Sequence, residues 1–306
     1  MSQSTRRVLL VVNPRADEAR AALATVASAL AAHGVTIVLS DEDAAEIDRT
    51  GPLADGLVTV VPSDEHAADD VDIVIVLGGD GTVLRAAERA RASGTPLFGV
   101  NLGHVGFLAE AEPEALADVV DAVVQGRWVA EERMTLDITV LSGGRVLHRT
   151  WAMNEVAVEK QARARMIDVL VEVDDRPLSR WGCDGVVCAT PTGSTAYAFS
   201  AGGPVVWPEV SAMLVVPLSA HALFARPLVV SPTSVVALDL GELGPAVLSA
   251  DGRRTLDVAG GSRIEVRQDP RPVRFARVTR APFTDRLVAK FALPVDGWRG
   301  RRSEAP

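Results

Sequence analysis

The chain has 306 residues, 48% of them apolar, which is enough for one large or two moderate domains with a sizeable core. Its formal net charge of −9 and sequence pI of about 5.1 argue against non-specific nucleic-acid binding, which needs a basic surface. No apolar run has the form of a signal peptide or a membrane-spanning segment, so we expect a cytoplasmic protein with neither a nucleic-acid nor a membrane partner.

A strand, a helix and a second strand are predicted at the start of the chain. Residues 7–12 and 35–39 are short apolar runs, and an Ala-rich helical pattern covers 17–33 between them. Such a βαβ unit is expected to cross over with the right hand that parallel sheets require. The acidic segment 40–70 shows little periodicity and predicts a variable helix and loop.

The most informative turn follows the apolar run 71–77. Residues 78–82 read Gly-Gly-Asp-Gly-Thr, and a helical pattern begins at Val83, so a strand, a tight turn and a helix start are predicted. Glycines permit positive φ and close approach of a ligand, and amides at a helix start favour phosphate. The carboxylate of Asp80 would repel phosphate, so it suits a general base, a metal partner or an acceptor for a ribose hydroxyl.

A second glycine loop, 101–107, follows the next predicted strand, 96–100. Parallel strands end at one edge of their sheet, so the two loops are expected to lie together where ligands of this architecture bind. Arg85 lies about one turn into the helix, where it either neutralises a phosphate or pairs with Glu88. A further helix is predicted over 113–126.

From Met134 onward, short runs with period-2 alternation indicate β-structure. The predicted strands cover 136–141, 145–151, 156–158, 166–173, 235–240, 246–250 and 263–266. Ser142-Gly143-Gly144 and Asp251-Gly252 are typical of hairpin turns. The cysteines, Cys183 and Cys188, would face opposite sides of one strand, which predicts two buried reduced thiols rather than a zinc site.

The predicted fold therefore combines two domains of different class. Residues 1–128 are expected to form an α/β N-terminal domain, a Rossmann-like parallel sheet with a glycine-rich loop. Residues 129–280 are expected to form an all-β, β-sandwich-like C-terminal domain. Helically spaced apolar residues in 281–306 predict a tail that packs back on the first domain.

Two features of the β region indicate ligand binding. Asn154-Glu155 stands between apolar residues, where the pair either is satisfied structurally or binds ribose hydroxyls. Residues 189–204 crowd small and hydroxyl side chains around Tyr197, the only tyrosine. This composition favours a pocket for a flat ring, with Tyr197 as its stacking face, over a plain Gly/Ser-rich loop.

Residues 78–82 resemble the signature shared by NAD kinases, diacylglycerol and sphingosine kinases and, more distantly, phosphofructokinases. Asn154-Glu155, 189–204 and 217–228 resemble NAD kinase motifs, and the resemblance covers nearly the whole chain. It implies an ATP- or polyphosphate-dependent NAD kinase that phosphorylates the 2′-hydroxyl of the adenosine ribose of NAD to give NADP. Asp80 would accept the hydroxyl proton, and a divalent cation, magnesium or manganese, would bridge the donor's phosphates without a protein-only metal site.

The resemblance also assigns binding residues. The phosphate-donor loop would comprise Gly78, Gly79, Gly81 and Thr82. NAD would be bound by residues of both domains: Asp80, Gly81, Arg85, Asn154, Glu155, Arg165, Asp184, Thr195, Ala196, Tyr197, Ala198, Phe199 and Ser200. A charged residue at the edge of a strand is the other explanation for Arg165. His221 either assists a phosphate or packs and caps locally.

The resemblance implies that 129–280 is the NAD-binding and oligomerisation domain, and that a homotetramer or homodimer is built through it with Asp251-Gly252 close to a neighbouring subunit's site. Two other functions fit parts of the sequence. A soluble lipid kinase of the diacylglycerol or sphingosine type shares the glycine loop but needs an apolar acceptor cleft, which the pocket at 195–200 does not favour. A non-catalytic dinucleotide sensor would not need the carboxylate of Asp80.

Overall fold

The structure is a computed structural model that describes residues 6–54, 56–102, 106–108, 116–161, 165–242, 244–278 and 282–295. The chain forms two compact units. Unit 1 comprises Met1–Glu132 together with Arg274–Pro306, and unit 2 comprises Arg133–Val273. The long strand β17 (Arg263–Arg277) begins in unit 2 and ends in unit 1.

Unit 1 contains a parallel sheet with the strand order β3-β2-β1-β4-β5, and the end of β17 lies beside β5. Its strands are β1 (Arg7–Val12), β2 (Thr36–Ser40), β3 (Val58–Val61), β4 (Ile73–Leu77) and β5 (Leu97–Val100). All five residues of β4 are completely buried, as expected for a parallel strand covered on both faces. The predicted α/β fold is confirmed, but β3 lies inside 40–70, where only a helix and loop were predicted.

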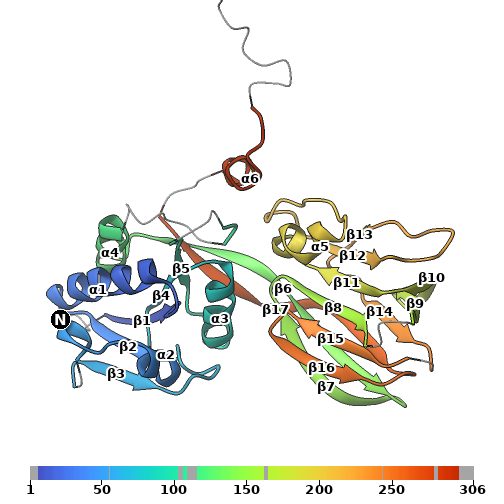
Figure 1. Cartoon of the computed structure of the whole chain (residues 1–306), viewed down its shortest axis with the longest axis horizontal. Helices are drawn as coiled ribbons and strands as arrows, with labels where there is room; N and C mark the ends of the chain where they lie inside the picture. Colours follow the sequence, from blue (N-terminus) through green and yellow to red (C-terminus); the bar gives the residue numbers. More distant parts are fainter. Residues whose placement is uncertain are drawn as a thin grey trace, which may run out of the picture. The chain divides into compact units, whose positions relative to one another are not determined.

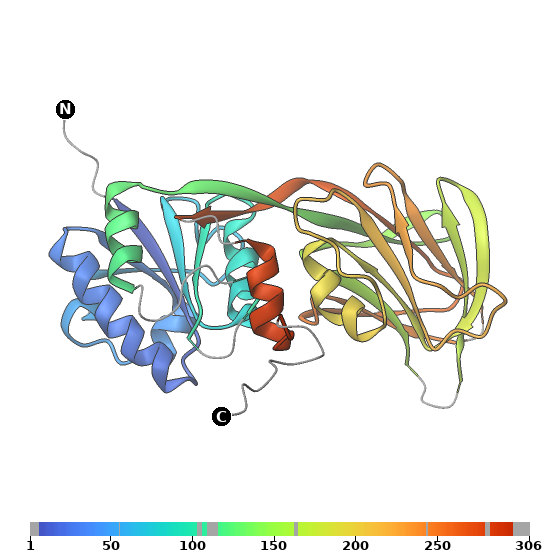
Figure 2. The same cartoon turned by 90° about the horizontal axis from the view of Figure 1, so that it is seen from above.

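Helices cover this sheet on both faces. They are α1 (Asp17–Ala32), α2 (Asp41–Glu46), the short η1 (Gly51–Leu53), α3 (Asp80–Ala90) and α4 (Leu116–Gln125). The last helix, α6 (Phe283–Phe291), has no buried residue. α1 and α4 lie side by side and share one hydrophobic core with alternate residues of β1 and β4 (Figures 1 and 2). Because β4 runs directly into α3, the sheet fixes the position of the turn at 78–82.

Unit 2 is built from two mainly antiparallel sheets, shown in green to orange in Figure 1. The strands other than β17 are β6 (Val129–Ser142), β7 (Arg145–Ala152), β8 (Glu155–Lys160), β9 (Ile167–Val173), β10 (Arg176–Cys183), β11 (Gly185–Ala189), β12 (Met213–Leu218), β13 (Leu228–Val230), β14 (Val236–Leu240), β15 (Ala246–Ala250) and β16 (Arg254–Val258). One sheet has the order β13-β12-β11-β8-β15-β16, and β10-β9-β14-β17 with β6 and β7 form the other. Residues of both sheets share one buried core, so the predicted sandwich is confirmed.

Two local predictions for unit 2 have different outcomes. The glycine turn after Ser142 joins β6 to β7, with φ of 55° at Gly143 and 75° at Gly144, as predicted for a hairpin. The cysteines do not share a strand, because β10 ends at Cys183 and Cys188 lies in β11. Both thiols are free and buried in the core between the sheets, and burial raises the pKa of each to about 12. They are therefore protonated and poorly reactive at neutral pH.

None of the helices in the described part of the chain is long and apolar enough to cross a membrane.

Candidate active site

The turn between β4 and α3 requires glycine at one position and leaves open space at two others. Gly78 has φ of 155°, which L side chains rarely adopt, and a Cβ there would lie 2.5 Å from Oγ1 of Thr82, so both conformation and packing favour glycine. A Cβ at Gly79 or Gly81 would meet no described atom within 4 Å. The outer surface of the turn is therefore open beside the first amides of α3, which lack intrahelical acceptors.

Asp80 is the first residue of α3, and its carboxylate is held by the loop after β5. Oδ2 accepts a hydrogen bond of 3.1 Å from the amide of Phe107, and Oδ1 accepts one of 3.1 Å from the amide of Leu108. A Cβ on Gly106 would lie only 2.4 Å from Oδ1, so glycine is what permits this approach. The two glycine loops do lie together as predicted, although 103–105 fall outside the described residues.

Arg85 points from α3 toward the end of β1 and toward α2. Its Nη2 lies 3.0 Å from Oδ1 of Asp43 and donates a hydrogen bond to the carbonyl of Val12. Asp43 is 1% exposed and also binds Nη1 of Arg89 at 2.6 Å. The guanidinium of Arg85 therefore belongs to a buried cluster of charges, in which it is oriented near the carboxyl end of the sheet.

In unit 2, the backbone of Asn154-Glu155 is held by a carboxylate from another hairpin. Asp251 starts the turn between β15 and β16, with positive φ there (53°) and at Gly252 (65°), as its Asp-Gly sequence predicts. Its Oδ1 accepts from the amides of Met153 (3.0 Å), Asn154 (2.7 Å) and Glu155 (3.3 Å). Three consecutive amides thus converge on one buried carboxylate.

Glu155 is 7% exposed, and its Oε2 has no hydrogen-bond partner among the described residues. Burial, and secondarily the nearby carboxylate of Asp251, raise the pKa of Glu155 to about 7, while a hydrogen bond from the amide of Tyr197 opposes them. A buried carboxylate oxygen without a partner is unusual in native proteins. A hydroxyl donor from a ligand would satisfy it.

The loop at 190–195 packs directly on this pair. The amide of Thr190 donates to the carbonyl of Asn154 at 2.8 Å, and the amide of Gly193 donates to Oγ1 of Thr190 at 3.1 Å. A Cβ on Gly193 would lie 2.0 Å from the carbonyl oxygen of Asn154, so the close approach requires glycine. The loop continues as two short helices, η3 (Thr192–Thr195) and α5 (Tyr197–Ser200).

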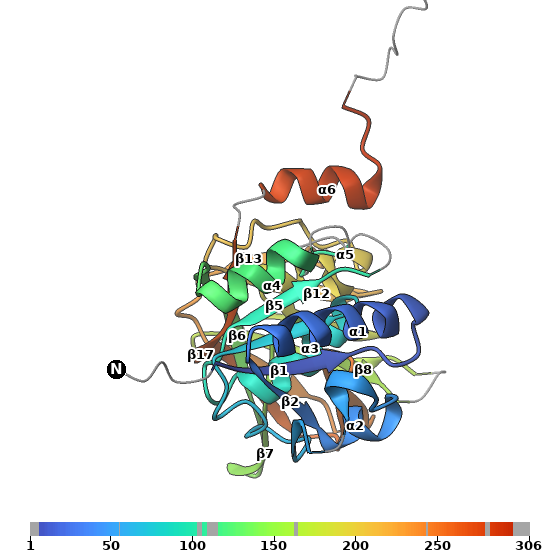
Figure 3. The same ribbon diagram turned by 90° about the vertical axis from the view of Figure 1, so that its left-hand side faces the viewer.

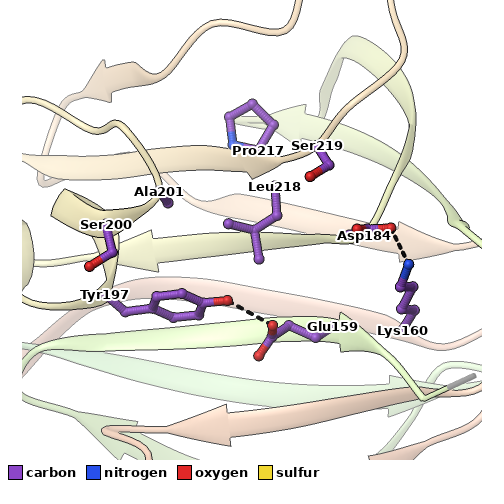
Figure 4. A pocket seen from close by; sticks show the side chains of 9 residues that line it. All are labelled: Glu159, Lys160, Asp184, Tyr197, Ser200, Ala201, Pro217, Leu218 and Ser219. Carbon is purple, nitrogen blue, oxygen red and sulfur yellow. Dashed lines mark hydrogen bonds and ion pairs between the residues drawn. The ribbon is translucent and has the colours of Figure 1, made fainter. Parts of the chain in front are cut away.

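A cavity of about 470 Å³ lies beside α5 in unit 2 (Figure 4). It is lined by Glu159, Lys160, Asp184, Tyr197, Ser200, Ala201, Pro217, Leu218 and Ser219. The hydroxyl of Tyr197 donates to Oε1 of Glu159 at 2.8 Å, and Nζ of Lys160 pairs with Oδ1 of Asp184 at 2.5 Å (Figure 4). Burial, followed by Glu159, raises the pKa of Tyr197 to about 12, so the ring carries a neutral hydroxyl.

Three of the predicted binding residues, Asp184, Tyr197 and Ser200, line this cavity. The sequence reasoning missed Glu159 and Lys160, which end the strand that Glu155 begins. The available signal was the alternation along β8, since residues two and four apart on a strand share one face. That rule puts Glu159 on the face of Glu155.

The other predicted residues have different surroundings. Ala198 is fully buried in a small apolar cluster with residues of β8, β11 and β12. Thr195 donates its hydroxyl to the carbonyl of Thr192, Ala196 is half-buried, and Phe199 is 40% exposed. Arg165 is exposed, two residues before β9. None of these four half-buried or exposed side chains is in the described lining of the cavity.

Both units match known protein families. Residues 8–128 match the ATP-NAD kinase N-terminal domain, and residues 153–278 match the ATP-NAD kinase C-terminal domain. The chain belongs to the NAD kinase family.

Curated NAD kinases are similar to this chain over nearly their whole length. The NAD kinase of Thermobifida fusca is 54% identical over 306 residues, which cover 98% of this chain and 94% of that protein. NAD kinase 2 of Streptomyces avermitilis is 53% identical over 296 residues, which cover 96% and 97%.

Solved NAD and NADH kinases share the fold. Yeast NADH kinase in complex with NADH has a TM-score of 0.83 and 23% identity, over 96% of this chain and 89% of that one. An NAD kinase from Archaeoglobus fulgidus in complex with ATP has a TM-score of 0.69 and 24% identity, over 95% and 100%. The two-unit architecture is therefore that of the NAD kinase fold.

Replacing Asp251 by Ala should destabilise the protein by roughly 3 kcal/mol, because three amides would lose their buried acceptor. Urea unfolding monitored by tryptophan fluorescence measures the effect. The control is Asp257→Ala on the exposed edge of the same hairpin, expected to cost less than about 1 kcal/mol. Equal losses in the two variants would contradict the role given to Asp251.

The pKa of Glu155 also predicts a pH dependence of stability. The folded-state pKa of about 7 exceeds the ordinary 4.5, so the folded protein binds more protons in this window, and stability falls as pH rises through it. The difference corresponds to about 3 kcal/mol. Unfolding free energies of the wild type and Glu155→Gln between pH 5 and 8 should converge at low pH, with the variant the more stable at pH 8. Glu209→Gln, at an exposed position, should follow the wild type.

Proposed function

We propose that this chain is an NAD kinase that transfers the γ-phosphoryl group of ATP to the 2′-hydroxyl of the adenosine ribose of NAD. The observation that carries the proposal is the carboxylate of Asp80, oriented by two amides at the open start of α3 in a chain of the NAD kinase family. Incubation of the purified protein with NAD and ATP, scored for NADP, tests it.

Asp80 is the proposed proton acceptor. The 2′-oxygen attacks the γ-phosphorus, the bond from that phosphorus to its bridging oxygen breaks, and ADP leaves with the electron pair of the broken bond. The hydroxyl proton passes to the carboxylate of Asp80. Most of the rate enhancement in such transfers comes from alignment and charge stabilisation, so a carboxylate fixed by two hydrogen bonds suits the role.

The phosphate donor is proposed to bind at Gly78, Gly79, Gly81 and Thr82. The open surface at Gly79 and Gly81 leaves room for phosphate against the positive end of the α3 dipole. The Archaeoglobus fulgidus relative was solved with ATP, which supports ATP as donor, and polyphosphate is the other proposed donor. In the described ranges no group of three or more His, Cys, Asp or Glu could hold a metal, so we propose that magnesium or manganese arrives on the donor's phosphates.

NAD is proposed to bind through Asn154, Glu155, Asp184 and Tyr197, assisted by Arg85, Arg165 and the segment 195–200. The unpartnered Oε2 of Glu155 is a ready acceptor for a ribose hydroxyl, and the ring of Tyr197 lines a cavity large enough for a base. The yeast NADH kinase solved with NADH supports a dinucleotide ligand. We also propose a cytoplasmic protein, in keeping with its two free thiols.

Asp80→Asn should lower kcat by roughly a hundredfold or more, the range for a positioned base, while the affinity for NAD changes only several-fold. Steady-state formation of NADP and equilibrium binding of NAD measure the two effects. The control, Asp118→Asn on the exposed face of α4, should keep normal kinetics. Near-normal turnover of Asp80→Asn would contradict the catalytic role.

Two outcomes with wild-type protein would support the other functions. Binding of NAD without turnover would support the non-catalytic sensor, and phosphorylation of a diacylglycerol or sphingoid base instead of NAD would support the lipid kinase.

Tyr197→Ala should weaken NAD binding by about 1–3 kcal/mol, because a stacking face is lost. Tyr197→Phe is the matched control, since it keeps the ring and removes only the hydrogen bond to Glu159. Isothermal titration of NAD into each variant measures the difference. Comparable weakening by Phe and Ala would show that the hydroxyl, not the ring, mediates binding.

A homotetramer or homodimer is proposed, with Asp251-Gly252 close to a neighbouring subunit's site. Support comes from apolar side chains exposed on unit 2, among them Leu223, Val229 and Val210, which a second copy could cover. Light scattering at micromolar concentration should give a multiple of the 32.3 kDa chain mass. A monomer with full activity would rule out a shared site.

A further inference from the structure

The C-terminal helix α6 contacts one residue of unit 1 in two independent ways. The ring of Phe107 contacts those of Phe283 and Phe291, with centroid distances of 6.0 Å and 5.8 Å and tilted interplanar angles. Nη1 of Arg286 donates a hydrogen bond of 2.9 Å to the carbonyl oxygen of Phe107. Both the side chain and the carbonyl of Phe107 are thus held by this helix, shown in red in Figure 3.

The same residue holds Asp80. The amide of Phe107 donates to Oδ2 of Asp80, and the next amide, of Leu108, donates to Oδ1. Phe107 and Leu108 are 8% and 4% exposed, so water competes poorly for these bonds. An uninterrupted path of direct contacts therefore runs from α6 through Phe107 to the carboxylate.

These contacts of α6 affect the orientation of the Asp80 carboxylate more than the stability of unit 1. None of the residues of α6 is fully buried, so the helix adds little to the core of unit 1. A carboxylate that must accept a proton from a bound hydroxyl is sensitive to its position, because displacements near 1 Å cost roughly a hundredfold in rate. Contacts that fix the Phe107 peptide are therefore expected to act on turnover before they act on binding.

We propose that α6 positions the catalytic base: Arg286, together with Phe283 and Phe291, holds the peptide of Phe107, and thereby Asp80, in the orientation for proton acceptance. This inference rests on the proposed role of Asp80. These three residues of α6 are positioning residues, since they act on the reacting hydroxyl only through Phe107 and Asp80.

Arg286→Ala is the first test, measured as kcat and KM for NAD and for ATP in the full-length protein. A fall in kcat of about tenfold is expected, with both KM values within about twofold. Arg286→Lys should recover most of kcat, because an ammonium still donates to the carbonyl of Phe107. Lys290→Ala, at an exposed position of the same helix, is the control and should behave as wild type. Phe291→Leu keeps apolar volume without the ring contact and tests the path independently if Arg286→Ala folds poorly.

A double-mutant cycle separates positioning from general damage to the fold. In the background of Asp80→Asn, Arg286→Ala should cause little further fall in kcat, because its effect passes through the carboxylate. The same tenfold fall in both backgrounds, or a rise in KM with kcat unchanged, would overturn the inference and leave the role of Asp80 intact. A normal kcat for Asp80→Asn alone would instead overturn the proposed function.

Discussion

The candidate site of unit 1 depends on a carboxylate in one loop that accepts hydrogen bonds from main-chain amides of a second loop. Asp80 belongs to the turn after β4, and its acceptors bind the amides of Phe107 and Leu108 in the loop after β5. Parallel strands bring the two loops to one edge, and these bonds orient the carboxylate within it. Gly78 and Gly106 allow the arrangement, because a Cβ at either position would enter the space of Thr82 or of Asp80.

In unit 2, a carboxylate also accepts hydrogen bonds from main-chain amides, but with a different result. Asp251 accepts from the amides of Met153, Asn154 and Glu155, and the interaction fixes a backbone instead of a reactive carboxylate. The arrangement costs stability, because it holds a second carboxyl group, that of Glu155, near Asp251 in a buried place and raises its pKa to about 7. Strained electrostatics of this kind are common where a protein binds ligands, since a ligand can relieve what the free protein tolerates.

The candidate site was only partly predictable from residue types. Composition singled out Tyr197, and Asp184 and Ser200 also line the cavity beside it. Ala198 belongs to the same run of small residues, yet it packs in the core, since successive positions of a short helix face different sides. Arg85 had two predicted partners, phosphate and Glu88, and the structure pairs it with Asp43, 42 positions away on another helix. Local patterns carry no information on such a distant partner.

The sequence alone predicted those features that depend on interactions between neighbouring residues. Apolar runs and helical spacing predicted the strand, turn and helix around Asp80, and Asp-Gly and Gly-Gly predicted two hairpins, because these features depend on neighbouring residues. The tertiary structure decided which distant segments meet. It placed Asp251 on the amides of 153–155, split the two cysteines between strands, and set α6 on Phe107. Those contacts join residues far apart in the chain, and only the closed sheets and packed cores bring them together.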